Sequence, residues 1–274
     1  MTVTNAVETT MIWGTVSGAS MVGMVISLLL SVVLPIFLGI FIYKKTKAWV
    51  PAFFIGCGIF VGFAMILEQI CHAIVLTVTG DVIRDNIWLY AIYGGLAAAL
   101  FEECGRWIAM KFCLKKHLTR ENALMYGAGH GGIEAFLILG MSSMSNLLTA
   151  AMINGGLMEK TMTALEPAQQ EVTYHQLSVL WTTPAYQFYL APVERISAIA
   201  LQIALSILVY SAVKTGRKLQ LAAAFGLHFA VDFLTVICAS MIPTWALELG
   251  LLVVVAVICA AVYKLVYVHS AEKK

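Results

Sequence analysis

Charged residues are what this sequence has least of. Only 12% of its 274 residues are Asp, Glu, Lys or Arg, whereas an ordinary soluble domain carries roughly 25%. In contrast, 61% are hydrophobic, and the mean hydropathy is +0.88. A soluble fold could not bury this much apolar surface in one core, and a disordered chain needs low hydrophobicity and high charge. Both classes are excluded, which leaves a membrane protein.

Several familiar motifs are also missing. The six cysteines include no Cys-x-x-Cys pair, so we expect small buried hydrophobic residues rather than a disulfide framework. There is no His-Glu-x-x-His zinc motif and no Walker loop. Residues 1–15 contain no Lys or Arg, so we expect no signal-peptide n-region. The net charge of +2 does not indicate nucleic-acid binding.

Seven apolar segments are long enough to cross a bilayer, which needs about 20 residues each. They lie at about 19–43, 49–78, 87–111, 122–142, 186–213, 219–239 and 242–266. The sequence therefore predicts an all-α polytopic membrane protein with one integral membrane domain over residues 1–274. The longest connection, at 143–185, is expected to be an external loop with one or two helices in the membrane interface.

Basic residues predict the orientation. Thirteen Lys and Arg side chains fall on one side of the seven spans, two fall on the other side, and two lie inside spans. By the positive-inside rule, the N-terminus is outside and the C-terminus is cytoplasmic.

Ionisable residues within spans are costly and usually functional. At 1.5 Å per residue, Glu102, His130 and His228 all lie about 12–14 Å from the cytoplasmic boundary. Glu134 and Asp232 lie one turn deeper, on the same helix faces as His130 and His228. Three spans thus place carboxylates and imidazoles in one layer, which favours a polar site between spans three, four and six.

Each motif also has a purely structural interpretation. In Glu102-Glu103-Cys-Gly-Arg106, one carboxylate could face a cavity while the other pairs with Arg106, or all three could form an ion-pair knot between helices. Four glycines surround His130 and permit close helix packing, but they do not explain Glu134. His228 and Asp232 alone could be a hydrogen-bonded pair.

A second group of charges lies nearer the outer interface. An ion pair at the membrane boundary is the simpler interpretation of Glu194 and Arg195, with Glu68 as a candidate partner. His72 is expected in the same outer layer as Glu68.

In order along the chain, Glu102-Glu103-x-x-Arg106, Gly-His130-Gly-Gly-x-Glu134 and His228-x-x-x-Asp232 resemble the YhfC family of bacterial intramembrane metalloproteases. That family is similar in turn to the CAAX prenyl protease and bacteriocin-processing membrane proteases. The resemblance covers nearly the whole chain and implies an intramembrane endopeptidase in the bacterial cell membrane, acting on a membrane protein or peptide among membrane lipids.

The resemblance also implies residue roles. Glu102 would be the base, with Glu103 and Arg106 orienting it. His130 would assist the water, and His228 and Asp232 would lie on the oxyanion side. The last motif ends in Asp232 where the relatives have Asn, and a carboxylate donates no hydrogen bond unless it is protonated.

Two chemistries therefore stay open. In the favoured one, Glu102 and His130 activate water with no cofactor. In the other, zinc binds His130 and His228 with Glu134 or Asp232 as the third ligand, and Glu102 is the base beside it. The rival functions are a proton- or ion-coupled transporter that uses the same buried Glu, His and Asp side chains, and a non-catalytic scaffold that binds a lipid or a partner helix.

Overall fold

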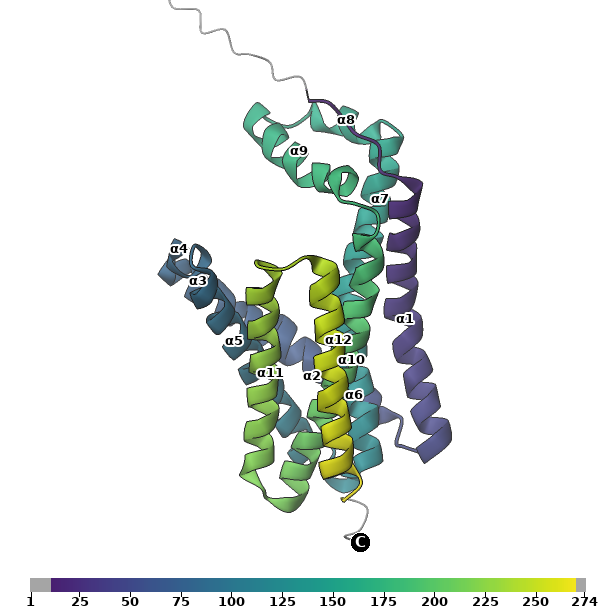
Figure 1. Cartoon of the computed structure of the whole chain (residues 1–274), viewed down its shortest axis with the longest axis vertical. Coiled ribbons are helices and arrows are strands. Elements are labelled where there is room, and N and C mark those ends of the chain that lie inside the picture. The colour runs from purple at the N-terminus through teal and green to yellow at the C-terminus, as the bar shows by residue number, and fades with distance from the viewer. Residues whose placement is uncertain (1–10, 270–274) are drawn as a thin grey trace, which may run out of the picture.

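The structure is a computed structural model, and it describes residues 11–269. Every element in this part of the chain is helical (Figure 1). The N-terminal residues 1–10, with most of the stretch that lacks basic residues, lie outside the described part, as do Lys273 and Lys274.

Seven helices are long and apolar enough to span a membrane, as expected. Their bounds are Gly18–Thr46, Pro51–Thr79, Ile87–Cys113, Arg120–Asn154, Gln187–Thr215, Lys218–Ala239 and Thr244–Tyr267. The first is α1 (Gly18–Thr46), the fifth is α10 (Gln187–Thr215) and the sixth is α11 (Lys218–Ala239). The protein is thus a multi-pass membrane protein.

The other four spans contain π-helical stretches. The second span comprises α2 (Pro51–Phe60), η1 (Val61–Glu68) and α3 (Gln69–Thr79); the third, α5 (Ile87–Ile108) and η2 (Ala109–Cys113); the fourth, α6 (Arg120–Ala135), η4 (Phe136–Gly140) and α7 (Met141–Asn154); the seventh, α12 (Thr244–Val262) and η5 (Tyr263–Tyr267). Short connecting helices are α4 (Asp81–Arg84), η3 (Lys115–His117), α8 (Leu157–Met162) and α9 (Pro167–Thr182).

The fourth span is longer than the sequence indicated. The apolar segment was expected to end near residue 142, but the helix continues through α7 to Asn154. The Ser and Asn residues of α7 lower its hydropathy without breaking the helix. Gly155 and Gly156 end it, and Gly156 has a φ of +68°, which favours glycine.

The predicted long connection contains the rest of α7 and both expected helices, α8 and α9. Asn154 holds the segment before α1 through two hydrogen bonds to the backbone of Val16, at 2.8 and 2.9 Å. Trp13 packs against Trp181 of α9 with ring centroids 5.8 Å apart. Figure 1 shows α8 and α9 at one end of the bundle, beside the start of α1.

The central span is α10. Within its most apolar window 72% of the residues are buried, whereas no other span exceeds 33%. It packs against α1, α5, α6, α11 and α12. A helix in this position can bring side chains to almost any site within the bundle.

The glycines around His130 serve close packing, as their structural interpretation predicted. A Cβ on Gly129 would lie 1.9 Å from the carbonyl oxygen of Phe53 in α2, and one on Gly56 would lie 2.2 Å from that of Tyr126. On another face of α6, a Cβ on Gly131 would lie 3.0 Å from the Cβ of Gln202 in α10. The α6 backbone therefore approaches two helices at distances that a larger residue would prevent.

The expectation of buried cysteines is wrong. All six are free thiols, but Cys104 and Cys113 are exposed and the other four are half-buried. In a membrane protein, lipid can surround a small apolar side chain as well as protein can, so burial in the protein is not required.

The basic ends of the spans gather at one end of the bundle. The end of α1, the connection from α10 to α11 and the described C-terminal end all lie opposite α8 and α9 (Figure 1). This arrangement agrees with the grouping of Lys and Arg, while the side of the membrane remains a prediction.

Candidate functional site

The third span supplies the first part of the site. Its helix α5 begins after Asn86, whose side chain accepts hydrogen bonds from the backbone N–H groups of Trp88 and Leu89 at 3.0 and 3.2 Å. Four turns later come Glu102, Glu103 and Arg106, all buried, with Arg106 completely so. Charges so deep in a bundle must find partners.

Arg106 lies between the two carboxylates. Its Nη1 is 3.3 Å from Oε1 of Glu103, and its Nη2 is 3.9 Å from Oε2 of Glu102. Spacings of three and four residues put all three side chains on one side of α5. Both carboxylates therefore approach the same guanidinium group, which agrees with the ion-pair alternative for this motif rather than with a single pair.

The fourth span brings His130 to Glu102. Nε2 of His130 lies 2.9 Å from Oε2 of Glu102, and the imidazole is completely buried. On the preceding turn of α6, the hydroxyl of Tyr126 lies 3.4 Å from Nδ1 of the same ring. Phe60 packs edge-on against the imidazole with centroids 5.2 Å apart. The ring is therefore fixed from three sides.

The sixth span brings His228 to Glu103. Nδ1 of His228 lies 2.8 Å from Oε1 of Glu103, while its Nε2 lies 3.9 Å from Oε2 of Glu102 and 3.5 Å from Oδ2 of Asp232. The Asp232 side chain is 35% exposed, the highest value in this network. Access to the site is therefore greatest on the Asp232 side.

The fifth span contributes a residue that the sequence analysis missed. Nε2 of Gln202 donates to Oε2 of Glu102 at 2.9 Å and to Oε2 of Glu134 at 2.8 Å. Arg106 donates to the amide oxygen of Gln202. Gln202 is uncharged, so the cost of a buried charge does not mark its position in the sequence. Gln202 could have been noticed as the only Asn, Gln or charged residue between Arg195 and Lys214.

Glu134 is linked to the outer charges rather than to the histidines. Its Oε1 lies 3.1 Å from Nη1 of Arg195, which also pairs with Glu194. The expected partner Glu68 instead pairs with His72 at 3.2 Å, and His72 bonds the hydroxyl of Tyr93 at 2.7 Å. Arg195 thus extends the network outward by way of Glu134.

The seven expected site residues consequently form one buried network with Gln202. It joins Glu102, Glu103, Arg106, His130, Glu134, Gln202, His228 and Asp232 from four spans. The sequence placed it between spans three, four and six, and the structure adds span five. Two buried atoms, Oε2 of Glu103 and Nε of Arg106, have no hydrogen-bond partner within residues 11–269.

The network contains residue types that bind zinc, but their arrangement does not fit a metal ion. In the described part of the chain, no three His, Cys, Asp or Glu side chains are placed to hold one. Nε2 of His130 points at the carboxylate of Glu102, and Glu134 is taken up by Arg195 and Gln202. The ligand set of the zinc alternative (His130, His228, Glu134 and Asp232) is therefore divided between two parts of the network.

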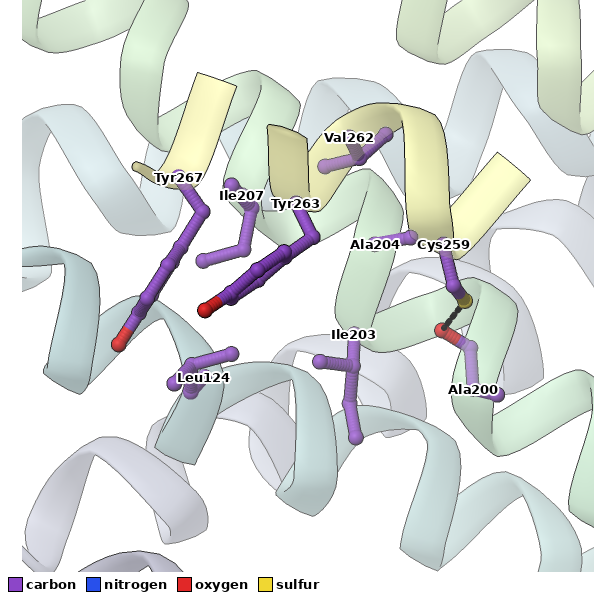
Figure 2. A pocket seen from close by; sticks show the side chains of 9 residues that line it. All are labelled: Leu124, Ala200, Ile203, Ala204, Ile207, Cys259, Val262, Tyr263 and Tyr267. Carbon is purple, nitrogen blue, oxygen red and sulfur yellow. Dashed lines mark hydrogen bonds between the residues drawn. The ribbon is translucent and has the colours of Figure 1, made fainter. Parts of the chain in front are cut away.

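One cavity lies away from these charges. It has a volume of about 330 Å³ and is lined by side chains of α6, α10, α12 and η5, among them Leu124, Ile203 and Tyr263 (Figure 2). Its lining is almost wholly apolar and contains no ionisable side chain of the network.

The chemistry that the network offers is that of a carboxylate hydrogen-bonded to an imidazole, which can accept and return a proton.

Comparison with known proteins agrees with this picture. The family model described as YhfC intramembrane metalloprotease matches residues 30–259, which include the whole network. The uncharacterized membrane protein YhfC of Bacillus subtilis (strain 168) is 41% identical over 222 residues, covering 78% of this chain and 83% of that protein. No solved structure matches the chain. This chain belongs to the YhfC intramembrane metalloprotease family.

Proposed function

We propose that the protein is an intramembrane endopeptidase that hydrolyses a peptide bond at the buried network. The observation that carries this proposal is the 2.9 Å contact between Oε2 of Glu102 and Nε2 of His130, deep within the bundle. A carboxylate held by an imidazole at hydrogen-bond distance is suited to general-base work. The family to which the chain belongs supports the same reaction class.

The proposed reaction begins with water beside Glu102. Glu102 takes a proton from the water while the water oxygen attacks the carbonyl carbon of the scissile bond. The carbonyl oxygen becomes an oxyanion, the C–N bond then breaks, and Glu102 returns the proton to the leaving nitrogen. The products are one carboxyl and one amino terminus, so atoms and charge balance.

The other residues hold this centre in place. Arg106 orients both carboxylates, and Glu103 fixes the ring of His228 through Nδ1. In an imidazolium, both nitrogens are donors, so Nε2 of His228 is the donor left for the oxyanion on the accessible Asp232 side. The described residues, as they are arranged, do not fit a metal ion, and the proposed reaction relies on the protein's own side chains.

The proposed setting is the cytoplasmic membrane of a bacterium. The substrate would be a membrane protein or peptide, since the site lies within the membrane-spanning helices. We propose that it reaches the site from the Asp232 side, because this side chain is the most exposed in the network.

A transporter fits the network less well. Hydrogen bonds run from Glu102 through Gln202 to Glu134 and Arg195. An amide and a guanidinium group do not release protons at ordinary pH, so this chain is interrupted for proton relay. A scaffold that binds a lipid or a partner helix leaves the costly buried carboxylates without a reason.

Glu102→Gln tests the proposal. Gln keeps the shape of the side chain but accepts no proton, so cleavage is expected to fall by about 10²–10⁴-fold while the protein still folds. Cells that contain the wild type, Glu102→Gln or the control Glu171→Gln are compared for new N-termini in their membrane proteins. Glu171 lies on α9, far along the chain from the network.

The expected result is a set of N-termini present with the wild type and with Glu171→Gln but missing with Glu102→Gln. The same set in all three strains would overturn Glu102 as the base. Proton movement by the purified protein in vesicles containing a pH-sensitive dye, together with no cleavage, would support the transporter instead.

A further inference from the structure

We propose that Gln202 is the positioning residue that holds the catalytic carboxylate of Glu102 in its reactive orientation. This inference rests on the proposed hydrolysis and adds a residue from the fifth span to the site. It follows from three features of Gln202: its burial, the use of all its polar atoms and the atom of Glu102 that it contacts.

Gln202 is only 3% exposed in the middle of the most buried span. An amide in such a place is unfavourable unless its donors and its acceptor are paired. Ser197 and Ser206 of the same helix satisfy themselves locally, through bonds from Oγ to the carbonyl oxygens of Val193 at 3.2 Å and of Gln202 at 2.7 Å. Gln202 instead directs its side chain to two other helices.

Every polar atom of this side chain is in use. The two N–H donors of Nε2 go to Glu102 and Glu134, and Oε1 accepts from Arg106. A carboxylate accepts and a guanidinium group only donates, so turning the amide around would place oxygen against oxygen. The network therefore fixes one orientation of the amide.

The contact with Glu102 falls on a single oxygen. Oε2 of Glu102 accepts from Gln202 at 2.9 Å and lies 2.9 Å from Nε2 of His130. Oε1 of Glu102 makes no hydrogen bond within residues 11–269. Two neighbours thus hold one oxygen, and the other is left to face water and substrate. Misplacing a reacting group by about 1 Å can cost 10²-fold in rate.

Gln202 also couples Glu102 to Glu134. One nitrogen lies 2.9 and 2.8 Å from an oxygen of each carboxylate. Without this donor between them, two carboxylates would face each other in a medium of low dielectric. A change in the charge of Glu134, or in its pairing with Arg195, can therefore affect the catalytic carboxylate through this one amide.

The test uses the full-length protein in detergent, with Gln202→Met and the matched control Ser197→Ala on the same helix. Met has nearly the length of Gln but makes none of the three contacts. Turnover is measured on a peptide that spans a cleavage site found by comparing the wild type with Glu102→Gln. We expect kcat to fall by roughly 100-fold and KM to stay within about twofold, since Gln202 acts on Glu102 and not on the substrate.

A second measurement needs no substrate. The melting temperatures of Glu102→Gln, Glu134→Gln and the double variant are compared in a double-mutant cycle. The cycle is measured once in the wild type and once in the Gln202→Met background. We expect the two substitutions to be non-additive in the wild type, and their coupling to change in size once Gln202 is replaced, because the donor that both carboxylates share is then lost and they repel each other directly. If Gln202→Met does not fold, Gln202→Asn replaces it, because the shorter amide cannot reach both carboxylates.

The outcomes separate the two proposals. Coupling through Gln202 without any proteolysis would overturn the proposed function and leave the positioning contacts intact. Proteolysis with a kcat for Gln202→Met equal to that of Ser197→Ala would overturn the role of Gln202. Additive melting temperatures in the wild-type cycle would overturn it as well.

Discussion

Glu102 and Glu103 are adjacent in sequence, yet they hold different histidines. Successive residues on a helix point about 100° apart, because one turn takes 3.6 residues. Glu102 consequently faces His130 of α6, while Glu103 faces His228 of α11. Arg106 lies three and four residues further on and reaches both. One short stretch of α5 thus ties two other spans together.

Metal content is the prediction that belongs to these residues. Since the described side chains do not fit an ion as arranged, we expect protein purified without chelator to contain well below one zinc per chain, and full activity after exhaustive chelation. Elemental analysis and a cleavage assay on the same sample measure both.

The family is described as a metalloprotease, which predicts the opposite outcome, a bound metal ion. Near-stoichiometric zinc that is lost in the double variant His130→Ala, His228→Ala would contradict a metal-free site. In that case, both imidazoles would have to leave the carboxylates that they contact in this structure and turn toward a common ion.

At the level of helices, the crossing of α2 and α6 controls where His130 lies. The two backbones approach at Gly56 and Gly129, so His130 follows directly after a point of close contact. A helix held at this distance has little freedom to rotate, which keeps the imidazole directed at Glu102.

Gly129→Ala tests this crossing. Its new Cβ would lie 1.9 Å from the carbonyl oxygen of Phe53, and backbone cannot give way as a side chain can. We expect a loss of roughly 1–3 kcal/mol in the free energy of unfolding, as for other overpacked sites, measured by thermal unfolding in detergent. The control is Gly58→Ala on α2, the other helix of this crossing, where a Cβ meets nothing within 4 Å.

Gly58→Ala should leave stability unchanged or raise it by up to about 1 kcal/mol, since Ala favours helix more than Gly does. Equal melting temperatures for the two variants would show that the α2–α6 contact is looser than the structure has it.

For the whole molecule, orientation is the main prediction. A reporter fused after Lys47, Lys116, Lys218 or Lys274 should be cytoplasmic, and one inserted within 155–180 should be external. The reason is the excess of Lys and Arg on one side of the spans. The measurement uses paired reporters, each active on only one side of the membrane. In every fusion the rest of the chain is kept complete.

A cytoplasmic signal from the 155–180 insertion would reverse the molecule. The bundle, its network and the proposed entry on the Asp232 side would be unchanged, but that side would then face the other half of the membrane.

The sequence by itself determined the class of the protein and its seven spans, and it predicted the depth of its charged residues. These are local properties: the length of an apolar run and a constant rise per residue decide them. It also indicated Glu102, Glu103, Arg106, His130, Glu134, His228 and Asp232 as one site. All of these lie in the network that the structure shows, while their catalytic roles stay proposals.

Only the tertiary structure decided which partners meet. It placed α10 at the centre, brought Gln202 between Glu102 and Glu134, and paired Arg195 with Glu134 rather than Glu68. Such pairings depend on how far each helix is rotated and where it crosses its neighbours. Those two quantities follow from the packing of many side chains at once, and no local pattern encodes them.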